Sequence, residues 1–454
     1  MEDNAANKLV LKEGSNIAVI GGGPSGSFFT YFALNFAERY GLNINIDVIE
    51  AKDFNCAGPA GCNNCGGIVS ESLIQMLSAD GIVLPADVIR KGIETYTLHL
   101  EQGFTEIGAP VDEQRIASMF RGLGPKGCSL GDHKSFDDHL MELCALKGAN
   151  IIHDRVLNME RNENGVIIKT KNNFEKKYDL VVGAVGLNKK TFELFSKISP
   201  SFVPPKTTCT FICEIHMDEA QIDKYFGNSM HVFLLSLPNI KFGALIPKSK
   251  YVTLVLLGSN IDKEIAGKFL DSKPVRKCFP KDFDLDSNIT CRCFPYINVG
   301  SAKSAYSDRV VLIGDSSASK LYKNGIGAAY ITAKAAANTA IFQGISKENF
   351  KKHFQPTCNN LEIDNTIGKF IFMVTTVIQA SPVLKSAMLR MVVNEQLKER
   401  HVRKLSSILW DTFTGSAPYK DIFLRFLNPG VIVILSWNTI RAMLRMIKYN
   451  KYEI

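Results

Sequence analysis

The chain has 454 residues, 46% of them apolar and 22% charged, so it is long enough to bury a sizeable core. Its polar N-terminal stretch lacks the apolar segment of a secretory signal peptide, and eleven cysteines in a chain of this length argue against a secreted disulfide scaffold. The net charge is +8, but no basic run interleaved with aromatic residues indicates a nucleic-acid surface, so we expect a cytoplasmic protein.

The first predicted unit is a strand, a glycine turn, a helix and a second strand, within residues 16–50. The strand NIAVI runs into GGGPSG, a helix-forming stretch follows, and NINIDVIE ends at Glu50. Gly21, Gly23 and Gly26 fit the dinucleotide-binding fingerprint, in which glycines allow a tight turn and a close approach to a diphosphate. A carboxylate at Glu50 can accept the ribose hydroxyls, which favours FAD or NAD over NADP.

The next segment, NCAGPAGCNNCGG at residues 55–67, contains three cysteines that allow several interpretations. A metal or iron–sulfur site at Cys56, Cys62 and Cys65 would need a distant fourth ligand, for which Cys128 is the obvious loop candidate. Cys62 and Cys65 have the C-x-x-C spacing of a redox pair. Two interpretations remain. One cysteine acts as a thiol beside a cofactor, or the glycines let the loop pass close to the cofactor and the cysteines only fill space.

Two later segments distinguish FAD from NAD. KYDLVVGAVG, near residue 180, predicts a strand that runs into a glycine turn. Further on, DRVVLIGDSS predicts a strand that ends at Gly314 and Asp315. A loop with Gly325 and Gly327 then leads into an Ala-rich helix.

In this order and spacing, GGGPSG, DLVVGAVG and VVLIGDSS resemble the FAD-dependent oxidoreductases of the para-hydroxybenzoate hydroxylase superfamily. Within that group, the chain is most similar to the geranylgeranyl reductases. The similarity rests on CGGIVSESL from Cys65, on SFDDHL from Ser135 with KGANII after it, and on FGALIPK from Phe242. Together these matches cover about residues 15–345.

The resemblance implies an α/β fold. A Rossmann-like FAD-binding domain is interleaved with a mixed β-sheet substrate domain, and an α-helical C-terminal segment follows. The expected FAD-binding segments are residues 1–90, 121–200 and 301–350. The expected substrate-domain segments are residues 91–120 and 201–300, and residues 351–454 form the helical segment.

The resemblance also assigns roles to residues. In the family, the Asp of the GD motif binds the ribityl chain, and the next helix points its N-terminus at the flavin pyrimidine. The catalytic candidates are Cys65, as a thiol beside the flavin, and Tyr322, as a second proton donor. The expected cofactor-binding residues are Gly21, Gly23, Pro24, Ser25, Gly26, Glu50, Gly66, Gly67, His133, Gly314, Asp315, Gly325, Ile326 and Gly327.

The chain departs from the family pattern at several positions. His133 stands where the family has an Arg three residues before FD, and Val185 stands where an acid or Ser is usual. Tyr322 replaces a proline in the loop after GD. Phe242 and Ala244 replace a Tyr and a Trp of the substrate wall, which the sheet strands would form.

The function implied by the resemblance is reduction of a C=C bond in an apolar, prenyl-lipid-like substrate, by hydride transfer from reduced flavin N5. A flavin-dependent monooxygenase is the alternative within the same fold. An electron-transfer subunit that combines FAD with a cysteine pair or an iron–sulfur cluster is a third reading. Because the sequence contains no second fingerprint after a strand, the electron donor stays open between NAD(P)H and ferredoxin.

The basic excess lies entirely in residues 365–454, which contain 13 Lys or Arg and five Asp or Glu. The uncharged run Phe426–Ile440 is 15 residues long and is broken by Asn-Pro-Gly, too short for a regular membrane span. An apolar helical face through Trp437, Ile440, Leu444 and Ile447, with basic residues beside it, predicts a peripheral membrane contact through residues 420–454. The alternative is a helix that packs on the FAD domain or covers the substrate cavity.

Overall fold

The computed structural model describes residues 9–110, 116–129 and 133–450, the last six of these without their side chains. The chain forms two compact units, each assembled from three segments. Unit 1 comprises residues 1–63, 121–207 and 297–363. Unit 2 comprises residues 64–120, 208–296 and 364–454. Each unit is therefore discontinuous in sequence.

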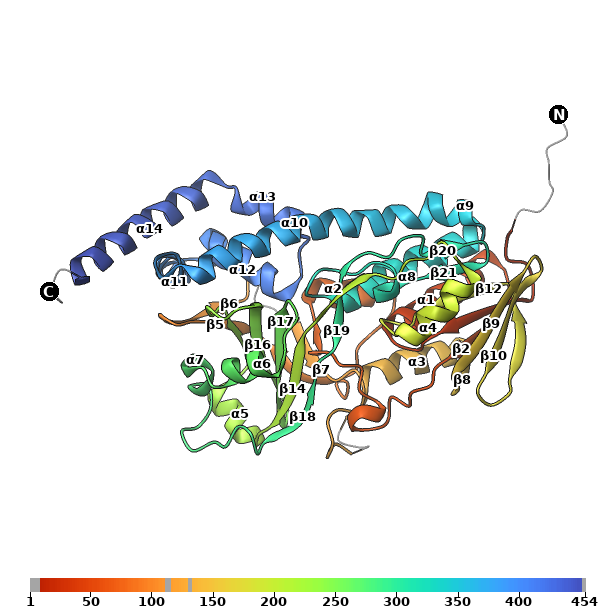
Figure 1. Cartoon of the computed structure of the whole chain (residues 1–454), viewed down its shortest axis with the longest axis horizontal. Helices are drawn as coiled ribbons and strands as arrows, with labels where there is room; N and C mark the ends of the chain where they lie inside the picture. Colours follow the sequence, from red (N-terminus) through yellow and green to blue (C-terminus); the bar gives the residue numbers. More distant parts are fainter. Residues whose placement is uncertain (1–8, 111–115, 130–132, 451–454) are drawn as a thin grey trace. The chain divides into compact units, whose positions relative to one another are not determined.

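Unit 1 is built on a six-stranded sheet whose strand order is β20-β21-β12-β1-β2-β8 (Figure 1). Its pairs are parallel except β20 with β21. The central strand β1 is almost completely buried, as a strand covered on both faces requires. The strands of this sheet are β1 (Ser15–Ile20), β2 (Ile44–Ile49), β8 (Asn150–Ile152), β12 (Leu180–Gly183), β20 (Tyr306–Ser307) and β21 (Val310–Leu312).

A second, three-stranded sheet and several helices complete unit 1. The sheet contains β9 (Val156–Asn162), β10 (Gly165–Thr170) and β11 (Glu175–Tyr178). The helices are α1 (Pro24–Tyr40), η1 (Gly58–Ala60), α3 (Phe136–Leu146), α4 (Lys189–Ile198), η2 (Gly314–Ser316), α8 (Gly325–Phe342), α9 (Lys347–Asn349) and η3 (Phe350–Phe354). Helices α1 and α8 pack together, because the ring of Tyr330 meets Phe28 and Phe32 edge-on, at centroid distances of 5.7 and 5.4 Å.

Unit 2 is built on a seven-stranded sheet with the order β18-β14-β17-β16-β15-β5-β6. Its pairs are antiparallel except β5 with β15. These strands are β5 (Thr95–Leu100), β6 (Gly103–Gly108), β14 (Phe211–His216), β15 (Ser229–Phe233), β16 (Ile240–Lys248), β17 (Tyr251–Gly258) and β18 (Ile289–Cys293). A small sheet contains β3 (Ile68–Val69), β4 (Ile89–Ile93) and β7 (Ile116–Met119).

The helices of unit 2 are α2 (Glu71–Ala79), α5 (Glu219–Tyr225), α6 (Lys263–Leu270), α7 (Lys273–Arg276), α11 (Pro382–Gln396), η4 (Arg400–Val402), α12 (Lys404–Thr414), α13 (Tyr419–Phe426) and α14 (Pro429–Asn450). Three elements contain residues of both units: β13 (Lys206–Cys209), β19 (Tyr296–Gly300) and α10 (Gln355–Ala380).

The two faces of the large sheet are covered by different helices. One face, which includes Phe233 and Leu245, forms a core with α5, α6 and α7. On the opposite face, Phe242 stacks on Phe372 of α10, with the ring centroids 6.1 Å apart. The replaced wall residue Phe242 is therefore packed against the C-terminal helices.

The observed boundaries differ from the expected ones at two places. Residues 64–90 belong to unit 2, because β3 pairs with β7 and the loop at Gly66 packs against Val255. The C-terminal helices from residue 364 onward also belong to unit 2. They rest on its sheet, where the Gln379 amide donates hydrogen bonds to the Leu235 and Lys241 carbonyls.

The C-terminal helices are long but bent. Among the described residues, no single helix is long and apolar enough to cross a membrane. Two bent pairs pass that length and composition test together: Lys347–Ala380 with Pro382–Gln396, at 105°, and Tyr419–Phe426 with Pro429–Leu444, at 64°. The second bend falls at the predicted Asn-Pro-Gly break, because proline removes a backbone donor and begins a new helix at α14.

Candidate active site

The glycine turn between β1 and α1 can be formed only by glycine at two positions. Gly21 has a φ of +104°, and a Cβ there would collide with the carbonyl oxygen of Ala184 at the end of β12. A Cβ at Gly26 would collide with the Gly21 carbonyl oxygen. Gly23 is the N-cap of α1 and provides no side-chain cap, and Pro24 follows in the first turn. The backbone of this turn is thus open to a ligand at the positive end of the α1 dipole.

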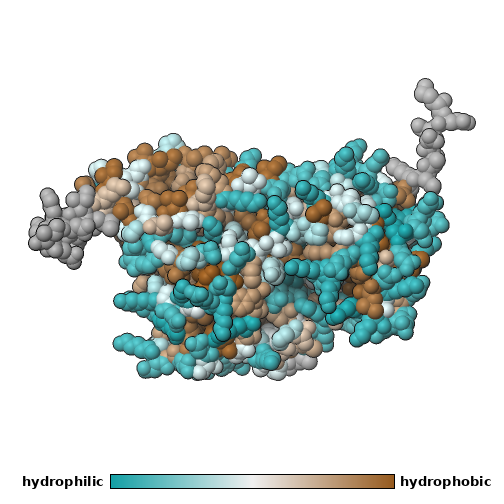
Figure 2. Space-filling view, in the orientation of Figure 1, coloured by the Kyte–Doolittle hydropathy of each residue, from teal (hydrophilic) through white to brown (hydrophobic). Residues whose placement is uncertain are grey.

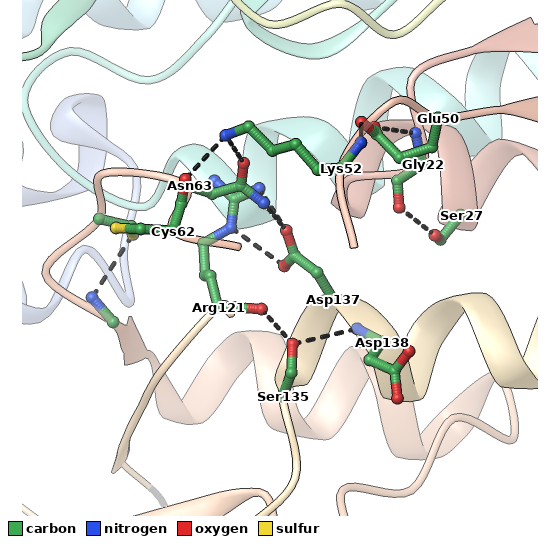
Figure 3. Close-up of polar contacts among 12 residues, drawn as sticks. Gly22, Ser27, Glu50, Lys52, Cys62, Asn63, Arg121, Ser135, Asp137 and Asp138 are labelled. Atoms are coloured by element: carbon green, nitrogen blue, oxygen red, sulfur yellow. Dashed lines mark hydrogen bonds and ion pairs between the residues drawn. The ribbon is translucent and has the colours of Figure 1, made fainter. Parts of the chain in front are cut away.

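Glu50 lies at the end of β2, where its carboxylate fixes the same turn. Its Oε2 accepts a hydrogen bond from the Gly22 backbone N–H at 2.8 Å, and its Oε1 accepts one from the Lys52 N–H at 2.8 Å (Figure 3). The Lys52 ammonium group in turn donates to the Cys62 carbonyl at 2.7 Å. The predicted ribose acceptor is therefore positioned beside the glycine turn.

An arginine that the sequence reasoning missed lies next to this turn. The Arg121 guanidinium donates two parallel hydrogen bonds to Asp137, from Nε to Oδ1 at 3.0 Å and from Nη2 to Oδ2 at 2.8 Å (Figure 3). Asp137 is completely buried, and the Asn63 amide also donates to it. A Cβ at Gly23 would lie 3.2 Å from Arg121 Nη2, so the guanidinium borders the glycine turn.

The element that holds this ion pair is the start of α3. The N-cap Ser135 accepts a hydrogen bond from the Asp138 N–H and donates one to the Arg121 carbonyl at 2.5 Å. His133, which we expected to replace the family arginine, forms a hydrogen bond between its Nε2 and the Leu123 carbonyl oxygen. The charge next to the turn is therefore that of Arg121, which lies 16 residues before Asp137 and outside the SFDDHL motif.

The GD motif lies at the other side of the α1 start. Gly314 has a φ of +61°, and a Cβ there would collide with Ser25 Oγ. Burial raises the pKa of Asp315, whereas a hydrogen bond from Ser319 and the charge of Arg121 lower it. Asp315 is half-buried. A bound ligand that donates hydrogen bonds to its carboxylate would stabilise the charged form.

The loop before α8 has an unusual backbone. Tyr322 and Asn324 both have positive φ values, of 60° and 53°, which non-glycine residues adopt rarely. Asn324 caps α8, because its Oδ1 accepts the Gly327 N–H at 2.9 Å. Gly325 precedes this capped amide, and Ile326 is buried. Tyr322 is half-buried, and its strained backbone is of the kind found at functional sites.

The CGG loop is held tightly within unit 2. Gly67 has a φ of +72°, and a Cβ there would collide with the Met119 carbonyl oxygen. A Cβ at Gly66 would lie 2.8 Å from Cγ2 of Val255. The half-buried Cys65 accepts a hydrogen bond at Sγ from the Gly67 N–H at 3.4 Å.

A buried ion pair lies beneath this loop, and the sequence reasoning gave it no role. Lys248 Nζ is 3.7 Å from Glu214 Oε1 and 4.0 Å from the centroid of the Phe120 ring. A Cβ at Gly67 would lie 3.2 Å from the same Nζ. Burial raises the pKa of Glu214, while the charge of Lys248 and a hydrogen bond from Thr253 lower it.

Cys56, Cys62 and Cys65 are all half-buried. Cys56 donates to Asp53 Oδ2 at 3.5 Å, and burial together with this carboxylate raises the pKa of the thiol. The readings of Cys56, Cys62 and Cys65 as a cluster or a redox pair stay predictions, as does the role of Cys65 as a lone thiol.

No protein-family model and no curated protein matches the sequence. Solved structures do match the fold. A geranylgeranyl bacteriochlorophyll reductase-like protein from Thermoplasma acidophilum aligns with a TM-score of 0.63 and 14% identity, over 94% of this chain and 100% of that chain.

Two monooxygenases align with lower scores. The p-nitrophenol 4-monooxygenase PnpA from Pseudomonas putida has a TM-score of 0.57 and 10% identity, over 90% of this chain and 100% of that chain. PqsL from Pseudomonas aeruginosa, described as a probable FAD-dependent monooxygenase, has a TM-score of 0.54 and 14% identity, over 81% and 97%. These likenesses confirm the α/β fold expected from the motifs.

Proposed function

We propose that this chain is an FAD-dependent oxidoreductase that reduces C=C bonds in a long apolar, prenyl-lipid-like substrate. The observation that carries the cofactor assignment is the joint placement of Glu50 and Arg121 at the turn of Gly21–Gly26. This turn has uncapped backbone N–H groups for a diphosphate, a guanidinium beside it, and a carboxylate for ribose hydroxyls. The GD motif provides the half-buried carboxylate of Asp315 at the same end of α1.

The reductase assignment is supported by the reductase-like structure, which aligns over nearly the whole of both chains. FAD, when bound and reduced, supplies the electron pair that a C=C reduction needs. The protein must hold the alkene, exclude water and deliver a proton. Cys65 and Tyr322 are our candidate donors, and Lys248 joins them because its ammonium group lies under the CGG loop.

A flavin-dependent monooxygenase is the second candidate, because the two aligned monooxygenases share the fold. The replacement of the family's Tyr and Trp by Phe242 and Ala244 in the substrate wall also fits a substrate other than a prenyl lipid. The two activities differ in their use of oxygen, which gives a direct discrimination.

The first experiment is reconstitution with FAD, with FMN as the matched control because it lacks the diphosphate and the adenosine ribose. We expect tight binding of FAD and weak binding of FMN, followed by bleaching of the flavin bands with dithionite under anaerobic conditions. An additional absorbance that also bleaches would support the electron-transfer reading with an iron–sulfur cluster. Failure to bind FAD would contradict the whole proposal.

The second experiment is a single anaerobic turnover with a geranylgeranyl-bearing substrate, analysed by mass spectrometry. The reductase adds two hydrogen atoms per reduced bond. Incorporation of labelled oxygen from O₂ in an aerobic assay with NAD(P)H would instead identify a monooxygenase. The same assay, run with ferredoxin in place of NAD(P)H, identifies the electron donor.

We further propose a peripheral membrane contact through α14. One stripe of this helix, with Val431 and Ala442, is buried. The opposite stripe, with Val433, Trp437 and Leu444, is 55–66% exposed. Figure 2 shows this apolar surface over α13 and α14. An exposed apolar stripe in the segment that carries the positive charge excess suits an anionic bilayer. Ile447 and the basic residues 445, 448 and 451 of the predicted face lie outside the described side chains.

A further inference from the structure

Three side chains that commonly bind metals meet in the interior of unit 2. They are His99 on β5, His231 on the neighbouring strand β15, and Cys278, just after α7; all three are buried. His231 is opposite Leu245 in the β15–β16 register, so it faces the core that α5, α6 and α7 cover. Because side chains alternate along β16, Lys248 points to the other face. The cluster and Lys248 therefore lie on opposite faces of the sheet.

The distances between the three potential ligand atoms suit one metal ion. His99 Nε2 lies 3.2 Å from His231 Nδ1, which lies 3.4 Å from Cys278 Sγ. The remaining distance, from Cys278 Sγ to His99 Nε2, is 3.8 Å. Metal bonds of about 2.0 Å to nitrogen and about 2.3 Å to sulfur, at tetrahedral angles, place such atoms about 3.3–3.6 Å apart. The cluster can therefore close around an ion with only small side-chain adjustments.

The charge and surroundings of the cluster indicate which ion it suits. The ring of His99 stacks on Phe233 at 4.6 Å, and that of His231 packs against Phe226 at 4.8 Å. A histidine binds a metal ion through its neutral imidazole, so neither His99 nor His231 would bring a charge to the site. Among the described residues, the group contains no carboxylate. A monovalent ion with one thiolate would make this apolar site electrically neutral, whereas a divalent ion would leave a net positive charge.

We propose that His99, His231 and Cys278 form a buried three-ligand site for a soft d¹⁰ metal ion, with copper(I) as the occupant and zinc(II) as its competitor. Nitrogen and thiolate ligands select these ions over magnesium or calcium. Binding replaces the proton of the Cys278 thiol, which passes to solvent while a metal–sulfur bond forms. The ion would join two strands to a segment that lies 179 residues from His99 and 47 residues from His231 in sequence, and it would thereby stabilise unit 2.

The test uses the full chain, stripped of metal under anaerobic, reducing conditions and then given copper(I) or zinc(II) alone. To remove thiols that bind metal elsewhere, the background variant carries Cys56→Ser, Cys62→Ser and Cys65→Ser. We expect one tightly held ion per chain in this background and at least a 100-fold loss of affinity in Cys278→Ser and in His231→Gln. Cys213→Ser is the matched control, because Cys213 is also a buried thiol in the same core but lies outside the cluster. It should retain the ion.

X-ray absorption of the metal-loaded background variant keeps the test valid if a ligand variant does not fold. One sulfur and two nitrogen neighbours around the ion are the expected result. Tighter binding of zinc(II) than copper(I) would overturn the choice of ion. Absence of a bound ion, or equal binding by Cys278→Ser, would overturn the site. The three groups would then form a hydrogen-bonded core, with the Cys278 thiol donating to the Pro274 carbonyl, 3.4 Å away.

Discussion

The guanidinium of Arg121 donates two parallel hydrogen bonds to the completely buried carboxylate of Asp137, and its Nη2 also lies next to Gly23. One charged group thus joins the start of α3 to the turn where we place the FAD diphosphate. Such bidentate, charge-assisted pairs are geometrically specific. Arg121 therefore has two separable effects, one on folding and one on cofactor affinity.

We predict that Arg121→Gln weakens FAD binding at least tenfold, because it removes the positive charge next to the diphosphate turn. It should also destabilise the apoprotein by about 3–5 kcal/mol, since Asp137 stays buried without its ionic partner. The measurements are FAD titration by flavin fluorescence and denaturant unfolding without FAD. Lys134→Gln, which breaks an ion pair between Lys134 and Glu142, is the control and should leave FAD affinity unchanged. Equal FAD affinity in Arg121→Gln and wild type would refute the diphosphate assignment.

The sequence was sufficient to predict the elements whose signals are local. The strand, glycine turn and helix at Gly21, the acid at Glu50 and the GD turn at Gly314 are each recognisable within one short window. Only glycine fits at these turns, because the φ values are positive or a Cβ would collide with neighbouring atoms. The spacing of the glycines in the sequence therefore predicts the turns.

The parts that could not be predicted depend on pairs far apart in sequence. Lys248 on β16 contacts Glu214 on β14 across the intervening strand β17. His99 contacts His231 only because β5 and β15 pair in parallel. The hydrophobic periodicity of a single sequence does not predict such pairings. For the same reason the sequence did not predict where the C-terminal helices pack, because an amphipathic pattern does not identify the surface that its apolar face contacts.

The buried pair beneath the CGG loop gives a pH-dependent prediction. Because the folded pKa of Glu214 is raised, its protonated form is favoured by folding, and this contribution is lost as pH rises through the folded pKa. Lys248→Met removes the compensating charge and should raise that pKa further. We expect a loss of about 3–5 kcal/mol at pH 8 and a smaller loss near pH 5, measured by denaturant unfolding.

The double variant Lys248→Met with Glu214→Gln should recover much of the stability, because no unpaired charge stays buried. Lys268→Met breaks an exposed pair with Glu264 and should change stability by less than about 1 kcal/mol. A pH-independent loss in Lys248→Met would show that Glu214 is not charged in the native state.

In unit 1, we expect the carboxylate of Asp47 to give the opposite dependence of folding stability on pH. It is buried and accepts hydrogen bonds from Lys176 and Tyr178, both at 2.8 Å, and from Asn150 at 2.9 Å. These bonds lower its pKa although burial opposes them, so its stabilising effect is present above the unfolded pKa and is lost as pH falls through the folded one. We expect Asp47→Asn to cost about 1.5–3 kcal/mol at pH 7, with the difference shrinking below pH 4. Unfolding at both pH values checks this, and a constant difference would contradict it.

The glycines of unit 2 provide a matched pair. Gly67→Ala should destabilise by at least about 2 kcal/mol, because it combines a positive φ with a collision against the Met119 carbonyl. Gly267 lies inside α6 with open space around it, so Gly267→Ala should stabilise by about 0.5–1 kcal/mol. Thermal unfolding of both variants checks the signs. A neutral Gly67→Ala would show that the CGG loop relaxes easily.

The exposed stripe of α14 predicts reversible binding to anionic bilayers. Vesicles of phosphatidylglycerol should sediment with the wild-type chain, and vesicles of phosphatidylcholine should not, because the C-terminal segment carries the positive excess. Replacing Trp437 and Leu444 by Glu should abolish binding, while Leu157→Glu, at a similarly exposed leucine on β9, should not. Raised ionic strength should weaken the wild-type interaction, because exposed charges are screened. Unchanged binding in the α14 variant would exclude this stripe as the contact. If Leu157→Glu abolished binding equally, the loss would reflect any reduction of exposed apolar surface and would not be specific to α14.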